Sequence, residues 1–257
     1  MTTHSGPKAL TEYILYQSRH KANKTFYILL VQGILAGMYI AIGAIASLKL
    51  SAGLSDPGLG SFLGALVFPV GIIAILLMQA ELFTSDTMVM VAVFAGRTKI
   101  TKIIRILCLI LIANLIGSIF IAYMSGAAEI FDAKTMEMII GKAVHKVELP
   151  VGKLLISSIL CNIIVCTGVC LSYSCKEEIS KIVVVWLAIT VFVITSTEHV
   201  VANMYYLFIG YFNGAEITLL QISKHLSIAA IGNFIGGGLI VSGANYLLAY
   251  RDIEKQH

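Results

Sequence analysis

The chain has 257 residues, of which 58% are hydrophobic and only 12% are charged, and its mean hydropathy is +0.90. A soluble domain carries about 25% charged residues, so this composition excludes a soluble protein and indicates an integral membrane protein. The formal net charge of +4 is small and the basic residues are spread over loops, which argues against a nucleic-acid-binding protein.

The N-terminal segment, residues 1–25, is polar. Leu10, Tyr13, Ile14 and Gln17 recur within it at helical spacing, with Lys and Arg nearby. This pattern predicts an amphipathic helix on the inner membrane surface. Two interpretations stay open, a surface anchor and a gating lid over an inner mouth. No short apolar core precedes a small-residue cleavage site, so we expect no cleaved signal.

Six apolar runs predict six membrane helices, because about 20 apolar residues cross a bilayer. The runs lie at roughly 26–48, 61–95, 104–126, 153–173, 182–212 and 227–249. The second and fifth runs are too long for a simple straight crossing. We expect residues 26–250 to form a single six-helix channel domain, followed by a short tail over 251–257.

The Lys and Arg counts set the expected orientation, since cytoplasmic loops are enriched in both residues. With a cytoplasmic N-terminus, the inner segments hold twelve of them and the outer segments hold six. Both termini are therefore expected on the cytoplasmic side. The membrane is expected to be the inner membrane of a bacterium. The tract 127–152 joins the two halves outside and is expected to form one short helix plus a loop.

The two halves of the chain form a weak internal repeat. Asn114-Leu115-Ile116-Gly117 in the third span returns as Asn233-Phe234-Ile235-Gly236 in the sixth, 119 residues later. Glu81 and Glu198 are offset by 117 residues. Three crossings end on the opposite side of the membrane, so the second copy is inverted, as in many transport proteins. The predicted fold is all-α, with two inverted three-helix repeats and broken second and fifth helices.

Small residues mark where the helices are expected to pack closely, since glycine lets two backbones approach. These stretches are Gly33 with Gly37 and Gly43, Gly60 with Gly64, and Gly232 with Gly236, Gly237 and Gly238. We read the cysteines in the same way, because they lack zinc-type spacing: Cys108, Cys161, Cys166, Cys170 and Cys175. We predict neither a metal site nor a cofactor.

The first polar interruption is the segment from Gln79 to Asp86, inside the second run. Lipid cannot satisfy bare backbone groups, so a break survives only where it is buried or lines a cavity. The helix is expected to stop near Glu81 and to restart after Thr84 or Ser85, with Ser85 and Asp86 capping the new start. We expect Thr84 to face a pore, with Leu82 and Phe83 beside it as an apolar constriction.

The second interruption runs from Thr195 to Asn203 and places Glu198 next to His199. An imidazole with a pKa of about 6.5 exchanges a proton near neutral pH. A hydrogen-bonded packing role for His199 stays open as the alternative. The restarted half-helix points a positive N-terminal end toward the middle of the membrane, which favours a transient anion there.

These segments resemble the signature of the formate/nitrite transporter family. The matching stretches are Ala80-Glu81-Leu82-Phe83-Thr84-Ser85, His145-Lys146, Cys161-Asn162-Ile163-Ile164-Val165-Cys166 and Glu198-His199-Val200-Val201-Ala202-Asn203-Met204. They follow the family's order over nearly the whole chain, and the nearest likeness is to its hydrosulfide channel branch. Two positions depart from the pattern, which usually has Gly at Gln79 and Gly or Ala at Ser158.

The resemblance implies an aquaporin-like six-helix fold in a homopentamer, with one pore per protomer. It makes His199 the central pore histidine, hydrogen-bonded to Thr84 and Asn162. Leu82, Phe83 and Thr84 would form a slit, and Phe192 and Ile194 would add apolar bulk at a second constriction. Lys146 would supply positive potential near the outer vestibule. The implied substrates are small monovalent anions of weak acids, such as hydrosulfide, formate and nitrite.

A mechanism and its rivals follow from this pattern. A bare anion is costly to desolvate in an apolar neck, whereas the neutral acid is far cheaper. We hypothesise that Lys146 and the half-helix ends attract the anion and that the His199 network stabilises or protonates it. An aquaporin-type channel for neutral solutes would carry Asn-Pro-Ala motifs, which this chain lacks. An intramembrane enzyme using Ser196 or Cys with His199 lacks supporting motifs, so we expect no enzyme.

Overall fold

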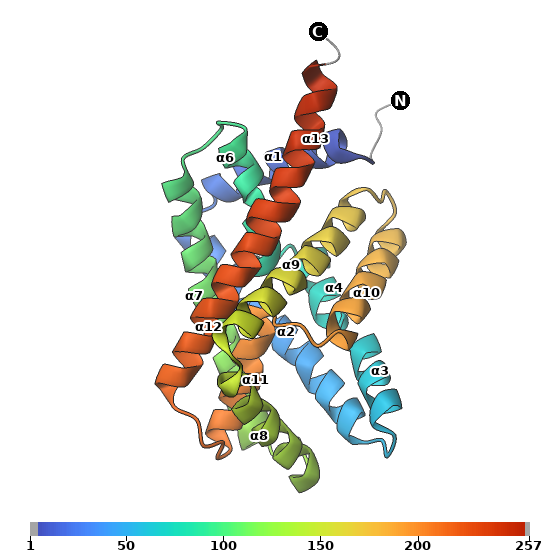
Figure 1. The fold of residues 1–257 in the computed structure, drawn as a ribbon, viewed down its shortest axis with the longest axis vertical. Coiled ribbons are helices and arrows are strands. Elements are labelled where there is room, and N and C mark those ends of the chain that lie inside the picture. The colour runs from blue at the N-terminus through green and yellow to red at the C-terminus, as the bar shows by residue number, and fades with distance from the viewer. Residues whose placement is uncertain (1–4, 255–257) are drawn as a thin grey trace.

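The computed structural model describes residues 5–254, and every regular element in that range is helical. The helices, which Figure 1 labels where there is room, are α1 (Pro7–Asn23), α2 (Phe26–Ala52), α3 (Pro57–Val67), α4 (Val70–Leu77), α5 (Phe83–Asp86), η1 (Thr87–Met90), α6 (Val91–Phe94), α7 (Ile100–Ala127), α8 (Ala133–Glu148), α9 (Val151–Tyr173), α10 (Glu178–Ile194), α11 (Val200–Phe212), α12 (Leu219–Asn233), η2 (Phe234–Val241) and α13 (Ser242–Glu254). The predicted all-α membrane fold is confirmed.

Within the described residues, five helices are long and apolar enough to cross a membrane. They are 26–52, 57–77, 100–127, 151–173 and 219–249. The predicted fifth span is divided instead between α10, with 17 residues, and α11, with 13. Helix 57–77 is followed, across the first break, by the shorter apolar helix 83–94, so the second run is broken as well. The six-span prediction therefore corresponds to five full helices and one divided pair.

A bend at Pro69 joins α3 to α4. Proline has no N–H to donate to the preceding turn, so a helix bends or breaks there. The indole N–H of Trp186 on α10 donates to the Leu66 carbonyl beside the bend, at 2.6 Å. The Leu66 carbonyl is therefore hydrogen-bonded in spite of the bend. Trp186 itself is exposed on the outer surface.

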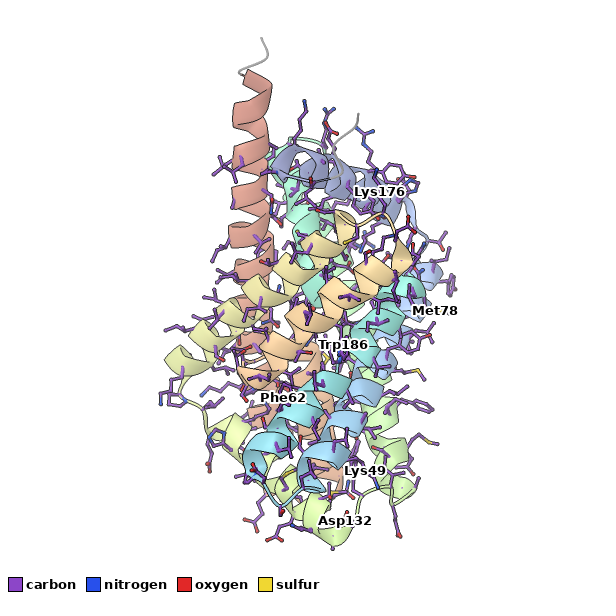
Figure 2. The ribbon with its side chains drawn as sticks, turned by 90° about the vertical axis from the view of Figure 1, so that its right-hand side faces the viewer. Lys49, Phe62, Met78, Asp132, Lys176 and Trp186 are labelled. Carbon is purple, nitrogen blue, oxygen red and sulfur yellow. The ribbon has the colours of Figure 1, made fainter. Side chains whose placement is uncertain are left out.

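The outer surface has the distribution of a protein in a bilayer. Large apolar side chains such as Phe62, Met78 and Trp186 are exposed along the sides of the bundle. Figure 2 shows these three between Lys176 near one end and Lys49 and Asp132 near the other. Exposed apolar sides between charged ends are the surface expected for contact with lipid or with neighbouring subunits.

Helices α1 and α13 lie together at one end of the molecule, so both chain ends emerge there (Figure 1). The Thr11 hydroxyl donates to the Asn245 carbonyl at 3.2 Å. The predicted N-terminal amphipathic helix is present as α1, and residues 1–4 of that segment lie outside the described residues. Helix α13 continues to Glu254, into the predicted tail over 251–257; residues 255–257 again lie outside the described range.

The internal repeat extends to four helical segments, one more than predicted. Helices α2 and α9 begin 125 residues apart, α5 and α11 begin 117 apart, and α7 and α12 begin 119 apart. Helices α1 and α8 begin 126 residues apart, so α1 corresponds to α8, the short helix predicted in the connecting tract. Figure 1 shows α1 and α8 at opposite ends of the molecule, as an inverted repeat requires.

Close helix packing occurs at the predicted glycines. A Cβ on Gly33 would meet Ala113, and one on Gly37 would meet the backbone of Asn114, both on α7. In the second repeat, a Cβ on Gly236 would meet the Ile159 carbonyl of α9. These contacts bring the asparagine of each repeat within reach of the neighbouring backbone, which positions the site described next.

Candidate functional site

The two helix breaks meet in the interior of the protein. Thr84 Oγ1 lies 3.0 Å from His199 Nε2, although the residues are far apart in sequence. Thr84 is fully buried and His199 is 3% exposed. A polar pair this deep in an apolar bundle is retained only where it is hydrogen-bonded. This contact is the centre of the candidate site.

Asn114 on α7 satisfies the backbone of the first break. Its Nδ2 donates to the Gly33 carbonyl at 2.8 Å and to the Glu81 carbonyl at 2.9 Å. Its Oδ1 accepts from the Phe83 N–H at 2.9 Å. One buried side chain therefore replaces the backbone partners that the broken helix lacks.

Asn233 repeats this arrangement at the second break. Its Nδ2 donates to the carbonyls of Ser158, at 2.7 Å, and Glu198, at 3.0 Å, and its Oδ1 accepts from the Val200 N–H at 2.9 Å. The asparagines of the repeated Asn-x-Ile-Gly motif therefore support both breaks. Sequence analysis found the repeat but missed this role, although the shared offset was the available signal.

Each break also contains a residue in the left-handed backbone region. Gln79 has a φ of 51° and Ser196 has a φ of 50°, at corresponding positions of the two repeats. Glycine is the residue that adopts this conformation without steric cost. The family pattern usually has Gly at position 79, whereas Gln79 adopts the same conformation here at a steric cost. The Gln79 carbonyl accepts a hydrogen bond from Gln32 Nε2 at 2.9 Å.

The capping predicted for the first break is wrong. Helix α5 begins at Phe83, with Leu82 as the N-cap residue and no side-chain cap. The Ser85 hydroxyl donates backwards to the Leu82 carbonyl at 3.1 Å, and Asp86 pairs with Lys21. The helix restarts one residue before Thr84, because Asn114 holds the Phe83 N–H.

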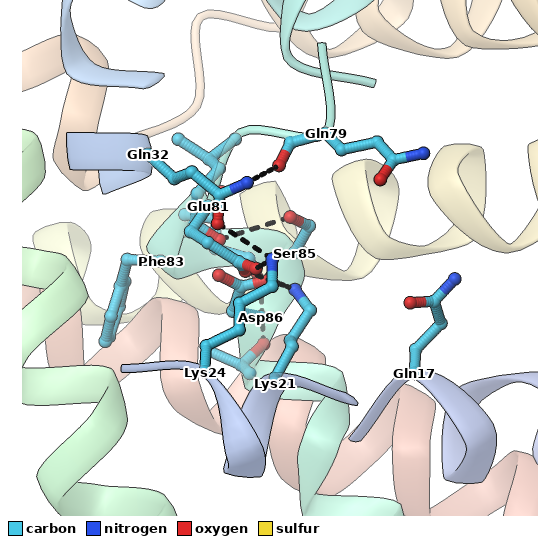
Figure 3. A network of polar contacts seen from close by, with 12 residues as sticks. Gln17, Lys21, Lys24, Gln32, Gln79, Glu81, Phe83, Ser85 and Asp86 are labelled. Carbon is cyan, nitrogen blue, oxygen red and sulfur yellow. Dashed lines mark hydrogen bonds and ion pairs between the residues drawn. The ribbon is translucent and has the colours of Figure 1, made fainter. Parts of the chain in front are cut away.

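An ion cluster joins α1 to the first break. Glu81 pairs with Lys21 and with Lys24, each at 2.6 Å, and Asp86 also pairs with Lys21. Figure 3 shows both lysines reaching from α1 to the two buried carboxylates. Burial acts to lower the pKa of Lys21, but Asp86 and Glu81 outweigh it, so its pKa is raised. Two lysine ammonium groups therefore lie against the two buried carboxylates, which offsets the cost of burying them.

A cavity of about 730 Å³ lies beside this cluster. Its walls come from α1, from the first break and from the turn between α9 and α10. The charged residues in the wall are Lys21, Lys24, Glu81, Asp86, Lys176, Glu178 and Lys181. The cavity therefore forms a polar mouth at the end of the molecule where both termini emerge.

A second ion pair supports the other break. Lys146 on α8 donates to Glu198 Oε2 at 2.7 Å, and Asn203 Nδ2 donates to the same oxygen at 2.6 Å. His225 on α12 lies 3.5 Å from Glu198 Oε2 through Nε2. Lys146 is 7% exposed, so the structure places it in a buried ion pair. Each of the two glutamates lies in a break and pairs with a lysine from α1 or α8.

The hydrogen bonds of His199 fix its protonation state. His199 is the N-cap residue of α11, and its Nδ1 accepts from the Ala202 N–H at 3.2 Å. A nitrogen that accepts this bond carries no proton, so the neutral ring has its proton on Nε2, the atom facing Thr84. The Phe192 ring lies 5.4 Å from the imidazole, between centroids, and Phe68 lies 5.8 Å beyond Phe192. The imidazole is thus an oriented donor beside an aromatic wall.

Asn162 lies in the same network, with different partners from those predicted. Its Nδ2 donates to the carbonyls of Thr84, at 3.1 Å, and Asn233, at 2.6 Å. In the described part of the chain it makes no hydrogen bond to His199, and its Oδ1 is buried without a partner. Asn162 therefore positions the backbone of Thr84 and leaves one acceptor unused.

The predicted constriction residues separate into two groups. Leu82, Phe83 and Phe192 are buried, with exposed fractions of at most 5%. Ile194 is 45% exposed, because two residues along a helix turn a side chain to a different face. The structure does not bring Ile194 into the group around His199. Phe68, which the sequence analysis did not single out, takes the place beside Phe192.

The half-helix starts have fewer free backbone N–H groups for an anion than the sequence predicts. The Phe83 and Val200 N–H groups are already bound to Asn114 and Asn233, and the Ala202 N–H is bound to His199. The other polar groups where the two breaks meet are side-chain groups, the Thr84 hydroxyl and the His199 Nε2–H.

Two broken helices that meet at a buried polar contact, inside a bundle with an apolar outer surface, define a multi-pass membrane channel or transporter. Known proteins narrow this class. Residues 8–247 match the family model described as formate/nitrite transporter. The chain belongs to the formate/nitrite transporter family. This is a family of channels and transporters and not of enzymes, which confirms the prediction that the protein is not an enzyme.

Relatives span the whole chain. It is 34% identical to the "Uncharacterized transporter YrhG" of Bacillus subtilis (strain 168), covering 97% of this chain and 95% of that protein. It is 29% identical to the "Formate channel BtFdhC" of Bacillus thuringiensis, with 98% and 96% covered. A solved structure described as a "Pentameric formate channel with formate bound" has a TM-score of 0.81 and 26% identity, with 88% of this chain and 98% of that chain covered.

Proposed function

We propose that this protein is a channel for small monovalent anions of weak acids, with formate, nitrite and hydrosulfide as the candidate substrates. The observation that carries the proposal is the buried contact between Thr84 and a neutral His199 whose Nε2–H faces the junction of the two breaks. Relatives named formate channels support an anion as the substrate. Hydrosulfide is the finer proposal, and it rests on the sequence resemblance to that branch alone.

The mechanism follows from the apolar walls around a pair of donors. Leu82, Phe83 and Phe192 exclude water from the neck, so a permeating anion loses most of its hydration there. The Thr84 hydroxyl and the His199 Nε2–H bond each other in the structure. As that contact opens, both donate to the anion, and these two hydrogen bonds replace part of its hydration. Charge-assisted hydrogen bonds are roughly twice as strong as neutral ones, so the contact favours an anion over a neutral solute.

Hydrogen bonding by His199 is better supported than full proton transfer. If His199 passed its Nε2 proton to the anion, the imidazole would stay neutral only by taking up another proton at Nδ1. Nδ1 accepts a hydrogen bond from the Ala202 N–H, so protonation of Nδ1 would break the N-cap of α11. We therefore assign stabilisation of the anion to the neutral imidazole.

The assembly and orientation belong to the same proposal. We propose a homopentamer with one pore in each protomer, residues 26–250 as the channel domain, and both termini on the cytoplasmic side of a bacterial inner membrane. The pentameric neighbour supports the subunit number. The excess of Lys and Arg in the segments on the side of the termini supports the orientation.

The test is flux through purified protein in liposomes, with formate, nitrite, hydrosulfide, chloride and glycerol measured side by side. We expect flux of the three weak-acid anions, little flux of chloride and none of glycerol. Swelling with glycerol but no anion flux would instead establish the rival, a channel for neutral solutes.

A further inference from the structure

Lys142 on α8 lies one helical turn before Lys146 and contacts a tyrosine of the second half-helix. Its Nζ is 4.2 Å from the centroid of the Tyr206 ring, and Lys146 Nζ is 5.8 Å from the same centroid. An ammonium at this distance over an aromatic face is attracted by the ring. Two lysines therefore converge on Tyr206, although sequence analysis singled out only the second.

Tyr206 lies on the face of α11 that also carries the central histidine. Residues three and seven positions apart share one face of a helix, so His199, Ala202 and Tyr206 form a single stripe. Tyr206 is two turns further along α11, which is about 10 Å at 1.5 Å per residue. This direction leads toward α8, at the end of the molecule opposite α1 (Figure 1).

The two lysines differ in how their charges are balanced. Lys146 is paired with Glu198, whose Oε2 also contacts Asn203 and His225. Within the described residues no carboxylate pairs with Lys142, and its side chain is exposed. Lys142 therefore presents an unbalanced positive charge at the outer end of the stripe.

The Tyr206 hydroxyl is a second donor at the same place. Tyr206 is 7% exposed, and in the described part of the chain no side chain or carbonyl is hydrogen-bonded to its hydroxyl. The neighbouring Tyr205 differs, since its hydroxyl lies 3.1 Å from Ser125 Oγ. A cation without a counter-ion and a phenol without a partner are the donors that a small anion needs.

We propose that Lys142 and Tyr206 form an outer anion-binding site, which binds a small monovalent anion before it passes along α11 to His199. The proposal rests on the proposed function. It also replaces Lys146 by Lys142 as the residue that attracts the anion, since Lys146 is already neutralised by Glu198.

The surroundings of Lys142 make the charge at this site sensitive to alkaline pH. Its ammonium packs over the Tyr206 ring, and desolvation by burial lowers the pKa of Lys142 to about 8. Lys146 lowers that pKa further, whereas Glu198 acts to raise it. Tyr206 and His225 are the remaining titratable groups at this end. Lys142 is thus mostly charged at neutral pH and loses its charge as the pH rises past about 8.

The experiment compares formate uptake into liposomes by the wild type, Lys142→Met, Lys142→Arg and Tyr206→Phe, with Lys134→Met as the control. Lys134 is an exposed lysine of the same helix. In Lys142→Met we expect the formate concentration at half-maximal flux to rise about threefold to tenfold, equivalent to about 0.7–1.4 kcal/mol. Wild-type flux should fall between about pH 7 and pH 9, and this fall should disappear in Lys142→Met and move to higher pH in Lys142→Arg, because Arg keeps its charge.

Tyr206→Phe keeps the ring and removes only the hydroxyl, so we expect it to raise the half-saturating concentration without changing the pH profile. Each variant is first compared with the wild type by size-exclusion elution. Equal half-saturation and equal pH profiles for Lys142→Met and Lys134→Met, in a protein that conducts formate, would overturn the outer site alone. If the wild type conducts none of the three anions, the proposed function fails and the outer site fails with it.

Discussion

At the scale of single residues, His199 combines two tasks that the sequence does not separate. Its Nδ1 caps α11 through the Ala202 N–H, and its Nε2 faces Thr84. The sequence indicated a functional histidine, because it stands in a polar break. It could not indicate which nitrogen carries the proton, since that follows from a backbone N–H three residues away in the folded helix.

Replacing Thr84 by valine tests the central contact with nearly the same side-chain volume. Valine leaves the buried His199 Nε2–H without its partner, so we expect the protein to lose about 1–3 kcal/mol of stability. Formate flux should fall with it, because one of the two donors in the neck is gone. Thermal unfolding in detergent and liposome flux measure the two effects. Thr84→Ser keeps the hydroxyl and should retain most of both; equal behaviour of the two variants would contradict this role.

At the scale of elements, each break is built from the same parts. An asparagine one helix away, a left-handed residue and a buried glutamate recur at corresponding positions of both repeats. The sequence predicted the existence and place of the breaks from polar residues inside apolar runs. It did not predict where the helices restart, because Asn114 and Asn233 supply the capping partners from a distant segment. Local capping residues such as Ser85 and Asp86 were therefore misleading.

Substitutions at Gln79 test the left-handed backbone of the first break. Gln79→Gly relieves the cost of a positive φ, which is roughly 1–2 kcal/mol for a residue with a Cβ, while the more flexible unfolded chain offsets part of that gain. We expect the unfolding temperature of Gln79→Gly to equal or exceed that of the wild type. Gln79→Val should lower it clearly, because a β-branched residue is a true outlier at this φ. A less stable Gly variant and a tolerated Val variant would show that residue 79 does not adopt this conformation.

At the scale of the whole molecule, the repeat places a short amphipathic helix outside the bundle at each end. A lysine of each helix pairs with the glutamate of one break. Lys21 and Lys24 of α1 reach Glu81, and Lys146 of α8 reaches Glu198. The sequence predicted both helices and the all-α membrane fold from periodicity and hydropathy. It could not pair the charges, because each pair joins segments more than 50 residues apart. For the same reason, the position of α1 beside the cavity lined by Lys21 and Lys24 could be seen only in the structure.

Removing the Lys21 charge tests how firmly α1 is joined to the bundle. Lys21→Met leaves Glu81 and Asp86 buried with Lys24 as their remaining cation, and breaking a buried pair costs about 3–5 kcal/mol. The folded-state pKa of Lys21 is raised, so its contribution is complete below its ordinary pKa of about 10.4 and is lost only as the pH rises through the folded value. We expect a lower unfolding temperature at pH 7 and faster amide exchange in α1. The double variant Lys21→Met with Asp86→Asn should recover part of the loss; no change in either quantity would mean that α1 is held by its apolar contacts.

The most direct measurement of the proposed function is formate flux through His199→Asn beside the wild type, in liposomes of equal protein content. Asparagine is a good N-cap residue, so this variant can keep α11 while removing the donor that faces Thr84. We expect saturable formate flux in the wild type and at least a tenfold lower flux in the variant, with equal elution of the two proteins in size exclusion. Equal formate flux would contradict the assignment of the Thr84–His199 contact as the point that an anion must pass.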